Sequence, residues 1–139
     1  MTDARLRKNC PCHSGRRYES CCAAFHRDER EAETPEALMR SRYSAFSLGL
    51  GGYLVKTLAA EHPDRALDEA TLVVELSRAK ERQRFLGLTI LEAHDDGVRG
   101  EVTFHARIFE RGRDRSFTER SKFVRENGAW RYAAGEALD

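Results

Sequence analysis

The chain has 139 residues, enough for one domain with a small appendage, and its 40% of hydrophobic residues is the content of a folded protein. The 24 basic residues nearly balance the 23 acidic ones, so a net charge of +1 gives no overall field that would attract nucleic acid or an anionic membrane. No apolar run reaches the roughly 18 residues of a membrane span, and residues 1–8 lack the apolar core of a signal peptide. We therefore expect a cytoplasmic protein, where clustered cysteines are more often metal ligands or redox groups than disulfides.

All four cysteines lie close together near the N-terminus, in the stretch NCPCHSGRRYESCC. So short a segment has too little apolar surface to fold alone, and four thiolates would complete the tetrahedral shell of a structural zinc site. We therefore predict Zn²⁺ as the cofactor, with oxidised or free thiols as the alternative. A Cys3His site, in which His13 or His26 replaces Cys22, is also open. The predicted metal ligands are Cys10, Cys12, Cys21 and Cys22.

Basic residues surround the cysteines in the sequence. Such cations would offset the negative charge of a four-thiolate shell, and neighbouring cations also lower the pKa of a thiol. This cluster is a local basic surface in a chain that is otherwise electrically balanced. Its members are Arg5, Arg7, Lys8, Arg16 and Arg17.

The stretch CPCHSGRRYESCC resembles the SEC-C motif, a small zinc-binding element first noted at the C-terminus of the SecA translocation ATPase. The usual form is CPCGSGKKY followed by C and then C or H, so His13 stands where the motif carries glycine. Glycine at that place permits a positive φ, which histidine tolerates less well. The resemblance implies a zinc site at the four cysteines. Because the SecA motif contacts chaperone or ribosome partners, it also implies a protein or ribosome-associated partner for the basic zinc-binding segment.

The next stretch, RDEREAE at residues 27–33, carries charge without apolar periodicity and predicts a solvated linker. It separates a zinc-binding segment, residues 1–30, from a larger domain, residues 31–139. Thr34 and Pro35 predict the start of a helix, as N-cap and first helical residue.

The helix that begins there has Met39, Tyr43 and Phe46 at helical spacing, and the glycines at positions 49, 51 and 52 predict its end. Two further helices are expected over residues 53–58 and 68–83. The second of these presents leucine and valine side chains on one face.

After residue 84 the apolar period becomes that of strands. Four segments read as strands, FLGLTILEAH, VRGEVTFHARIFER, SFTERSKFVRE and AWRYAA, with hairpin turns at the Asp-Gly and Asn-Gly pairs. Helices followed by hairpin-linked strands predict an α+β fold with an antiparallel sheet. The helices can cover so long a sheet only if it curves around them, so we expect a cone that encloses a hollow.

Four blocks of this half, EALMRSRYSAF, YLVKT, FLGLTI and ERSKFVRENGAWRYAAGE, resemble in the same order blocks of the YchJ family of bacterial proteins. The resemblance covers nearly the whole chain, from Cys10 to Glu136. It implies an N-terminal SEC-C motif followed by a nuclear transport factor 2-like domain. It implies no particular activity, because the family has none that is settled.

Folds of this type often place a binding pocket between the curved sheet and the helices. Strand side chains alternate, so His105 shares a face with Arg107, and an inward-facing His105 would meet Glu119 as an acid/base pair. In the alternative, the more apolar set around Phe104 fills the core and His105 faces solvent. The predicted pocket residues are Arg42, Tyr43, His105, Arg107, Ser121 and Trp130, and the catalytic candidates are His105 and Glu119.

These observations favour a zinc-stabilised binding or adaptor protein that holds an unknown small ligand in its pocket. A small acid/base enzyme, of the isomerase or hydratase type, is the alternative, and a zinc or redox sensor is a third and weaker hypothesis. An exposed curved sheet is also compatible with a homodimer. No membrane or nucleic-acid partner is expected.

Overall fold

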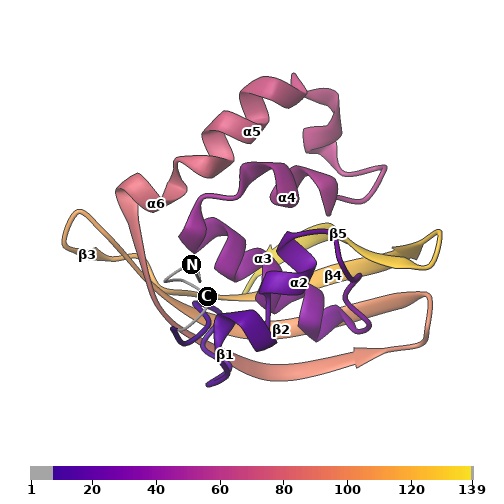
Figure 1. Ribbon diagram of the computed structural model, residues 1–139, viewed down its shortest axis with the longest axis horizontal. Helices are drawn as coiled ribbons and strands as arrows, with labels where there is room; N and C mark the ends of the chain where they lie inside the picture. Colours follow the sequence, from indigo (N-terminus) through magenta and orange to yellow (C-terminus); the bar gives the residue numbers. More distant parts are fainter. Residues whose placement is uncertain (1–7, 139) are drawn as a thin grey trace.

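Helices precede strands along the chain, and in this computed structural model, which describes residues 8–138, the helices pack on one face of an antiparallel sheet (Figure 1). The α+β architecture predicted from the sequence is confirmed. The helical elements are η1 (Tyr18–Ser20), α2 (Ala23–His26), α3 (Pro35–Leu48), α4 (Gly51–Lys56), η2 (Pro63–Ala66), α5 (Glu69–Ser77) and α6 (Ala79–Arg82). The strands are β1 (Gln83–Asp95), β2 (Arg99–Glu110), β3 (Arg113–Asp114), β4 (Phe117–Glu126) and β5 (Ala129–Ala137).

The start and end of α3 follow from local chemistry. The Thr34 hydroxyl accepts a hydrogen bond from the backbone N–H of Ala37 at 3.1 Å, and Pro35 occupies the first helical position. Gly49 ends the helix with a φ of 74°, in the left-handed region that glycine adopts without strain. Gly51 does not end α3, as the sequence suggested, but begins α4. A Cβ on Gly51 would lie 2.0 Å from the carbonyl oxygen of Val73, so glycine permits close packing of α4 on α5.

Two other expectations are corrected by the structure. The single helix expected over residues 68–83 is divided into α5 and α6, and β1 already begins at Gln83. Residues 27–33 are not a purely solvated linker, because Ala32 is only 4% exposed and packs in the core. The neighbouring Glu31 carboxylate pairs with Arg131 of β5 at 2.9 Å. Residues 27–33 therefore contact both the core and strand β5.

The sheet has the order β1-β2-β4-β5, with β3 paired to β2. The predicted Asn-Gly turn connects β4 to β5, and Asn127 and Gly128 both have positive φ, 51° and 82°, as a tight hairpin turn requires. Two irregularities in the register of β1 against β2, at residues 85–87 and 90–92, locally increase bend and twist. No helix in residues 8–138 combines the length and the hydropathy that a membrane crossing needs.

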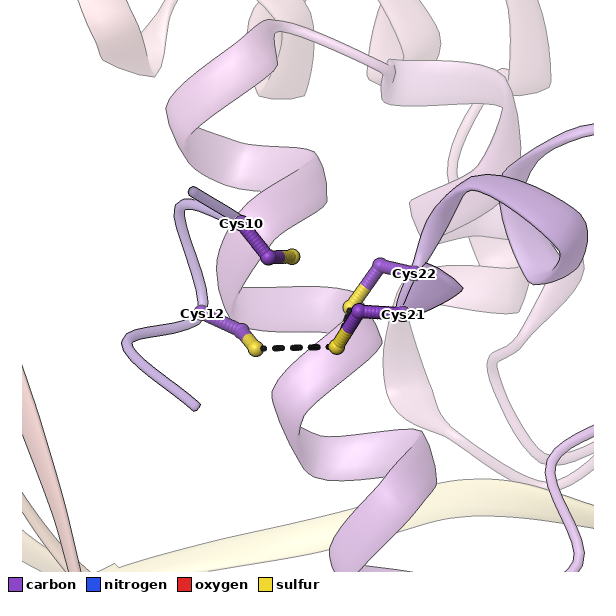
Figure 2. Close-up of side chains that lie close together, drawn as sticks. All are labelled: Cys10, Cys12, Cys21 and Cys22. Carbon is purple, nitrogen blue, oxygen red and sulfur yellow. Dashed lines mark hydrogen bonds between the residues drawn. The ribbon is translucent and has the colours of Figure 1, made fainter. Parts of the chain in front are cut away.

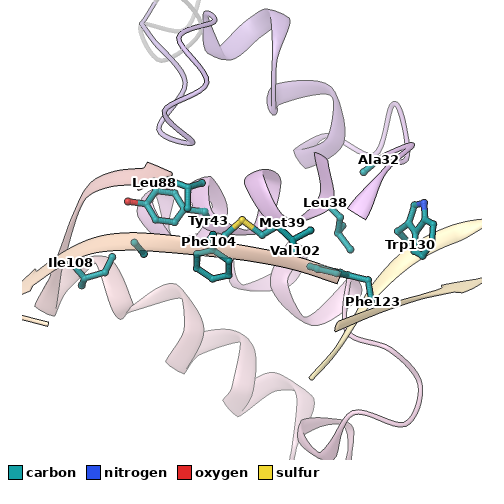
Figure 3. Packing of buried hydrophobic residues seen from close by; sticks show 11 residues of the cluster. Ala32, Leu38, Met39, Tyr43, Leu88, Val102, Phe104, Ile108, Phe123 and Trp130 are labelled. Atoms are coloured by element: carbon teal, nitrogen blue, oxygen red, sulfur yellow. The ribbon is translucent and has the colours of Figure 1, made fainter. Parts of the chain in front are cut away.

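The main core lies between α3 and the inner face of the sheet (Figure 3). Along β2 the buried residues alternate with more exposed ones, and Phe104 and Ile108 contribute to this inner face. Met39 and Tyr43 of α3 reach the same layer. Trp130 is 2% exposed and belongs to this core, where its indole N–H donates to the carbonyl oxygen of Glu33 at 3.2 Å.

Candidate metal centre and adjoining pocket

The four cysteine side chains converge beside α3 from two separate stretches of chain (Figure 2). Their sulfur atoms all lie within 4.8 Å of one another, with 3.5 Å between Cys12 and Cys21 and 3.9 Å between Cys21 and Cys22. A tetrahedral zinc site with Zn–S bonds of about 2.3 Å has sulfur–sulfur distances of about 3.8 Å. All four thiols are free of disulfide bonds. The set therefore fits the coordination shell of one metal ion.

The loop that carries Cys10 and Cys12 is shaped by backbone hydrogen bonds. The N–H of Cys10 donates to the carbonyl oxygen of Arg16 at 2.8 Å, and that of His13 donates to the carbonyl oxygen of Cys10 at 3.1 Å. His13 has a φ of 61°, in the left-handed region where the SEC-C motif has glycine. The turn thus aims both sulfurs to one side of the loop.

Hydrogen bonds among the crowded thiols separate their pKa values. The pKa of Cys12 is lowered, because Cys10 and Cys22 hydrogen-bond to its thiolate. The hydrogen bond with Cys12 is also the main cause that raises the pKa of Cys10 to about 12. The pKa of Cys22 is raised by its hydrogen bonds to Cys10 and Cys12 and by burial. Because metal ligands must be deprotonated, a divalent metal at this site would displace the remaining protons and let every sulfur bind as a thiolate.

The two nearby histidines attach the segment to the larger domain. His26 Nε2 is 2.8 Å from the carbonyl oxygen of Ser41 on α3, and its Nδ1 is 2.6 Å from the Tyr18 hydroxyl. Both ring nitrogens of His26 are thereby engaged outside the sulfur cluster. The ring of His13 packs edge-on against Tyr43, with 5.8 Å between centroids, and its Nε2 is 3.4 Å from the carbonyl oxygen of Phe85. This geometry favours the four-cysteine set over a Cys3His site.

A cavity of about 390 Å³ lies next to this junction, between α3 and the sheet. Most of its wall is apolar, including Phe85, Phe104 and Ile108. The structure brings together four of the polar residues singled out in the sequence, and it adds Tyr132, which was not among the predicted pocket residues. The four are Arg42, Tyr43, Glu119 and Ser121.

His105, Arg107 and Trp130 do not line this cavity, which corrects the predicted site. Glu119 of β4 is in register with Phe104, and His105 is in register with Thr118, so His105 and Glu119 point to opposite faces of the sheet. The His105 Nδ1 lies 3.0 Å from the Thr118 hydroxyl on the outer face. The predicted acid/base pair is therefore wrong. The more apolar composition of the strand face that carries Phe104 could have indicated from the sequence that this face is the buried one.

Arg42 and Glu119 lie in contrasting surroundings within the cavity wall. Arg42 Nη1 donates to the carbonyl oxygen of Leu54 at 2.7 Å and to the Thr57 hydroxyl at 2.5 Å. Burial lowers the pKa of Arg42 to about 10, so the guanidinium stays charged at neutral pH. Glu119 Oε2 accepts hydrogen bonds from the hydroxyls of Ser121 at 2.5 Å and Tyr132 at 3.3 Å.

The chain combines four clustered cysteines that could hold a metal ion with an antiparallel sheet covered by helices. These features define a SEC-C motif protein with a nuclear transport factor 2-like domain. The model of one family, described as the YchJ middle NTF2-like domain, matches residues 34–135. The chain belongs to the YchJ family, also called UPF0225. The family and fold expected from the sequence are thereby confirmed.

Relatives and solved structures agree with this assignment. A UPF0225 protein of Vibrio parahaemolyticus is 38% identical over 130 residues, which is 94% of this chain and 75% of that protein. The UPF0225 protein YchJ of Shigella dysenteriae is 41% identical over 128 residues, which is 91% of this chain and 81% of that protein. The solution structure of a SEC-C motif-containing protein from Rhodopseudomonas palustris superposes with a TM-score of 0.81 at 38% identity, covering 95% of this chain and 100% of that one.

Proposed function

We propose that this chain is a zinc-stabilised binding protein. Zn²⁺ held by the four cysteines fixes the SEC-C segment against α3, and the adjoining cavity binds a small ligand. The observation that carries this proposal is the convergence of four cysteine sulfurs within 4.8 Å of one another. Sulfur ligands in a tetrahedral arrangement are typical of zinc and of iron–sulfur centres, and single-ion four-cysteine sites with this motif favour zinc.

A structural role for the ion follows from how the sulfurs are enclosed. Cys10, Cys12 and Cys22 are buried, and only Cys21 is partly exposed. Four protein ligands close the shell of a tetrahedral zinc ion, whereas a catalytic zinc keeps one position open for water or substrate. The ion would supply binding energy that folds the segment and no reaction of its own.

The cavity supports binding better than acid/base chemistry. Its one carboxylate, among the described residues that line it, is Glu119, which is held by the hydroxyls of Ser121 and Tyr132. Burial raises the pKa of Tyr132 to about 12, so its hydroxyl keeps the proton that it donates. With His105 on the outer face, no imidazole from the sheet enters this hollow.

We also propose that the basic residues of the segment contact a protein or ribosome-associated partner. Lys8, Arg16 and Arg17 are exposed, whereas the histidines of the segment are turned to α3 and β1. The test is a pull-down with wild type and with the double variant Arg16→Glu/Arg17→Glu, both zinc-loaded. Loss of partners from the variant alone supports the contact, and equal recovery by both proteins contradicts it.

The zinc assignment is tested by elemental analysis of protein purified under reducing conditions without chelators. We expect one zinc per chain, and Co²⁺ in its place should give the visible spectrum of a tetrahedral thiolate site. Cys12→Ser should lose the metal, while the control Ser14→Ala, which keeps all four sulfurs, should retain it. Metal-free wild-type protein, or cystines found by mass spectrometry, would contradict the proposal.

A further inference from the structure

Arg42 carries a buried positive charge that forms no direct ion pair in the described residues, although Glu119 and Asp64 act on it at longer range. Its side chain is 8% exposed, and its two hydrogen-bond acceptors, the Leu54 carbonyl and the Thr57 hydroxyl, are both neutral. Its guanidinium lies 4.7 Å from the centre of the Tyr132 ring, which is also uncharged. Within residues 8–138, no carboxylate oxygen lies within 4.0 Å of Arg42. Since a buried cation is normally paired with an anion, this position has the electrostatics of an anion site.

One edge of the Arg42 guanidinium has no hydrogen-bond partner among residues 8–138. Both hydrogen bonds use Nη1, which leaves Nε and Nη2 without a protein acceptor in the described part of the chain. No side-chain nitrogen there is both fully buried and unpartnered, so these two nitrogens keep accessible surface. Arg42 is one of the residues that line the cavity. The Nε and Nη2 groups form a planar fork that matches the two oxygens of a carboxylate.

The other charged groups of the cavity differ from Arg42. Glu119 is only partly buried and already receives two hydroxyl donors, so water can complete its solvation. It would also repel a second negative group on a ligand. Arg115 lies 3.9 Å from Glu110, and its side chain is 57% exposed. One unpaired cation therefore faces walls such as Phe85, Phe104 and Ile108, which fits a single negative charge on an apolar body.

We infer that the cavity binds monocarboxylates with an alkyl or aryl body, whose carboxylate accepts hydrogen bonds from Nε and Nη2 of Arg42 while the body packs on the aromatic wall. This inference rests on the proposed binding function and names the ligand class for it. The dimensions are compatible, because ligand pockets in proteins begin at about 300 Å³. Binding places the ligand beside Tyr43 and Phe85, the residues that His13 contacts.

The test is calorimetric titration of the full-length, zinc-loaded protein with decanoate, decan-1-ol and decylammonium at concentrations below micelle formation. We expect decanoate to bind roughly ten- to a hundredfold more tightly than decanol, as hydrogen bonds to a charged group allow. Arg42→Met should abolish this preference but still bind decanol, and Arg42→Lys should keep part of it. Arg115→Met, the matched control, removes an exposed arginine of the same cavity and should change decanoate affinity less than about twofold.

Each outcome separates this inference from the proposed function. If decanol or decylammonium binds as tightly as decanoate, or if Arg42→Met keeps the preference, the carboxylate inference is wrong and the binding function stands. If none of the three probes binds, both the carboxylate inference and the proposed ligand-binding function are wrong for this cavity. The zinc content would still test the structural metal site separately. If Arg42→Met loses its circular dichroism signal or its zinc, the comparison of probes on the wild type decides alone.

Discussion

The SEC-C segment and the nuclear transport factor 2-like domain are stabilised by different physical means. The segment has a small buried cluster, which consists mainly of its cysteines with Tyr18 and Ala23. The domain has a continuous apolar core that runs from Ala32 and Trp130 at one end to Ile108 at the other (Figure 3). Burial of apolar surface is the main stabilising term for the domain, whereas the segment buries few residues other than its cysteines. The two parts should therefore respond differently to the same treatment.

Helix α3 is the element that both parts share. Its inner face packs on the sheet through residues such as Met39, and its other side receives the SEC-C segment. On that side Arg40 Nη1 donates to the carbonyl oxygen of Cys12 at 3.0 Å. His26 Nε2 lies 2.8 Å from the carbonyl oxygen of Ser41. A change at the sulfurs can thus loosen one side of α3 while the apolar side stays packed. The following predictions test how independent the two parts are.

The largest effect is expected from loss of the metal. Cys12→Ser removes one thiolate, and zinc binding in small four-ligand elements supplies about 10–16 kcal/mol of folding free energy at neutral pH. We expect backbone amides of residues 8–26 to exchange rapidly with solvent, while those of β2 and β4 stay protected. Hydrogen exchange followed by mass spectrometry measures both regions in one experiment.

A matched control for that experiment is Ser14→Ala, because Ser14 contacts Cys21 at 3.3 Å without being a ligand. Its exchange pattern should remain that of the wild type. Loss of protection in the strands of Cys12→Ser, to the same degree as in the segment, would show that the chain unfolds as one unit. The distinction drawn between the two parts would then be wrong.

The reverse perturbation removes apolar contacts from the domain. Leu38 of α3 is 1% exposed, and truncation of a buried leucine to alanine costs about 2–5 kcal/mol. We expect Leu38→Ala to lower the free energy of unfolding by that amount, measured by urea denaturation, and to keep one zinc per chain. Leu67→Ala is the control, because Leu67 is 55% exposed and should change stability by less than about 0.5 kcal/mol. Loss of zinc from folded Leu38→Ala would contradict the separation.

A third, smaller effect is expected at the junction. His26→Phe keeps an aromatic ring but removes the hydrogen bonds to Tyr18 and to the Ser41 carbonyl. The Ser41 carbonyl still accepts the Ser44 hydroxyl, so the expected cost is that of the lost hydrogen bonds, about 0.5–1.5 kcal/mol each. We expect faster exchange in residues 18–26 with the metal still bound and the strands unchanged. The control is His94→Phe on the exposed end of β1, which should leave exchange at residues 18–26 as in wild type. Unchanged exchange in His26→Phe would show that the metal alone holds the segment.

Much of this architecture could be predicted from residue patterns, because the relevant signals are local. The Thr34 cap, the Asn127–Gly128 turn and the alternation along β2 depend on neighbours in sequence, and each appears in the structure. The sulfur cluster could be predicted equally well, because all four cysteines lie in one short stretch.

The remaining features depend on contacts between distant residues. The alternation along β2 predicts that His105 and Phe104 face opposite ways, but it does not predict which face is buried. The residues that line the cavity depend on which face is buried. The roles of His13 and His26 depend on partners 72 and 15 residues away, Phe85 and Ser41. The charge run at residues 27–33 gave no sign of its attachment to β5, because Arg131 is 100 residues from Glu31.

The smallest effect is expected from that last contact, between the stretch that leads out of the SEC-C segment and β5. The hydrogen bond from Arg131 is the main cause that lowers the pKa of Glu31 from its ordinary value of 4.5. A carboxylate with a lowered folded pKa stabilises the protein above its unfolded pKa, and this contribution is lost as the pH falls through the folded value. Because the side chain is 44% exposed and solvent screens the pair, we expect Glu31→Gln to cost less than about 1 kcal/mol at pH 7. The cost should shrink as the pH falls below 4.5, measured by urea denaturation at several pH values. Glu29→Gln, which disturbs only a 3.9 Å pair with Arg27, should cost still less. A deficit in Glu31→Gln that grows on acidification would contradict a stabilising role for the Glu31 carboxylate, which pairs with Arg131 and also with Lys56.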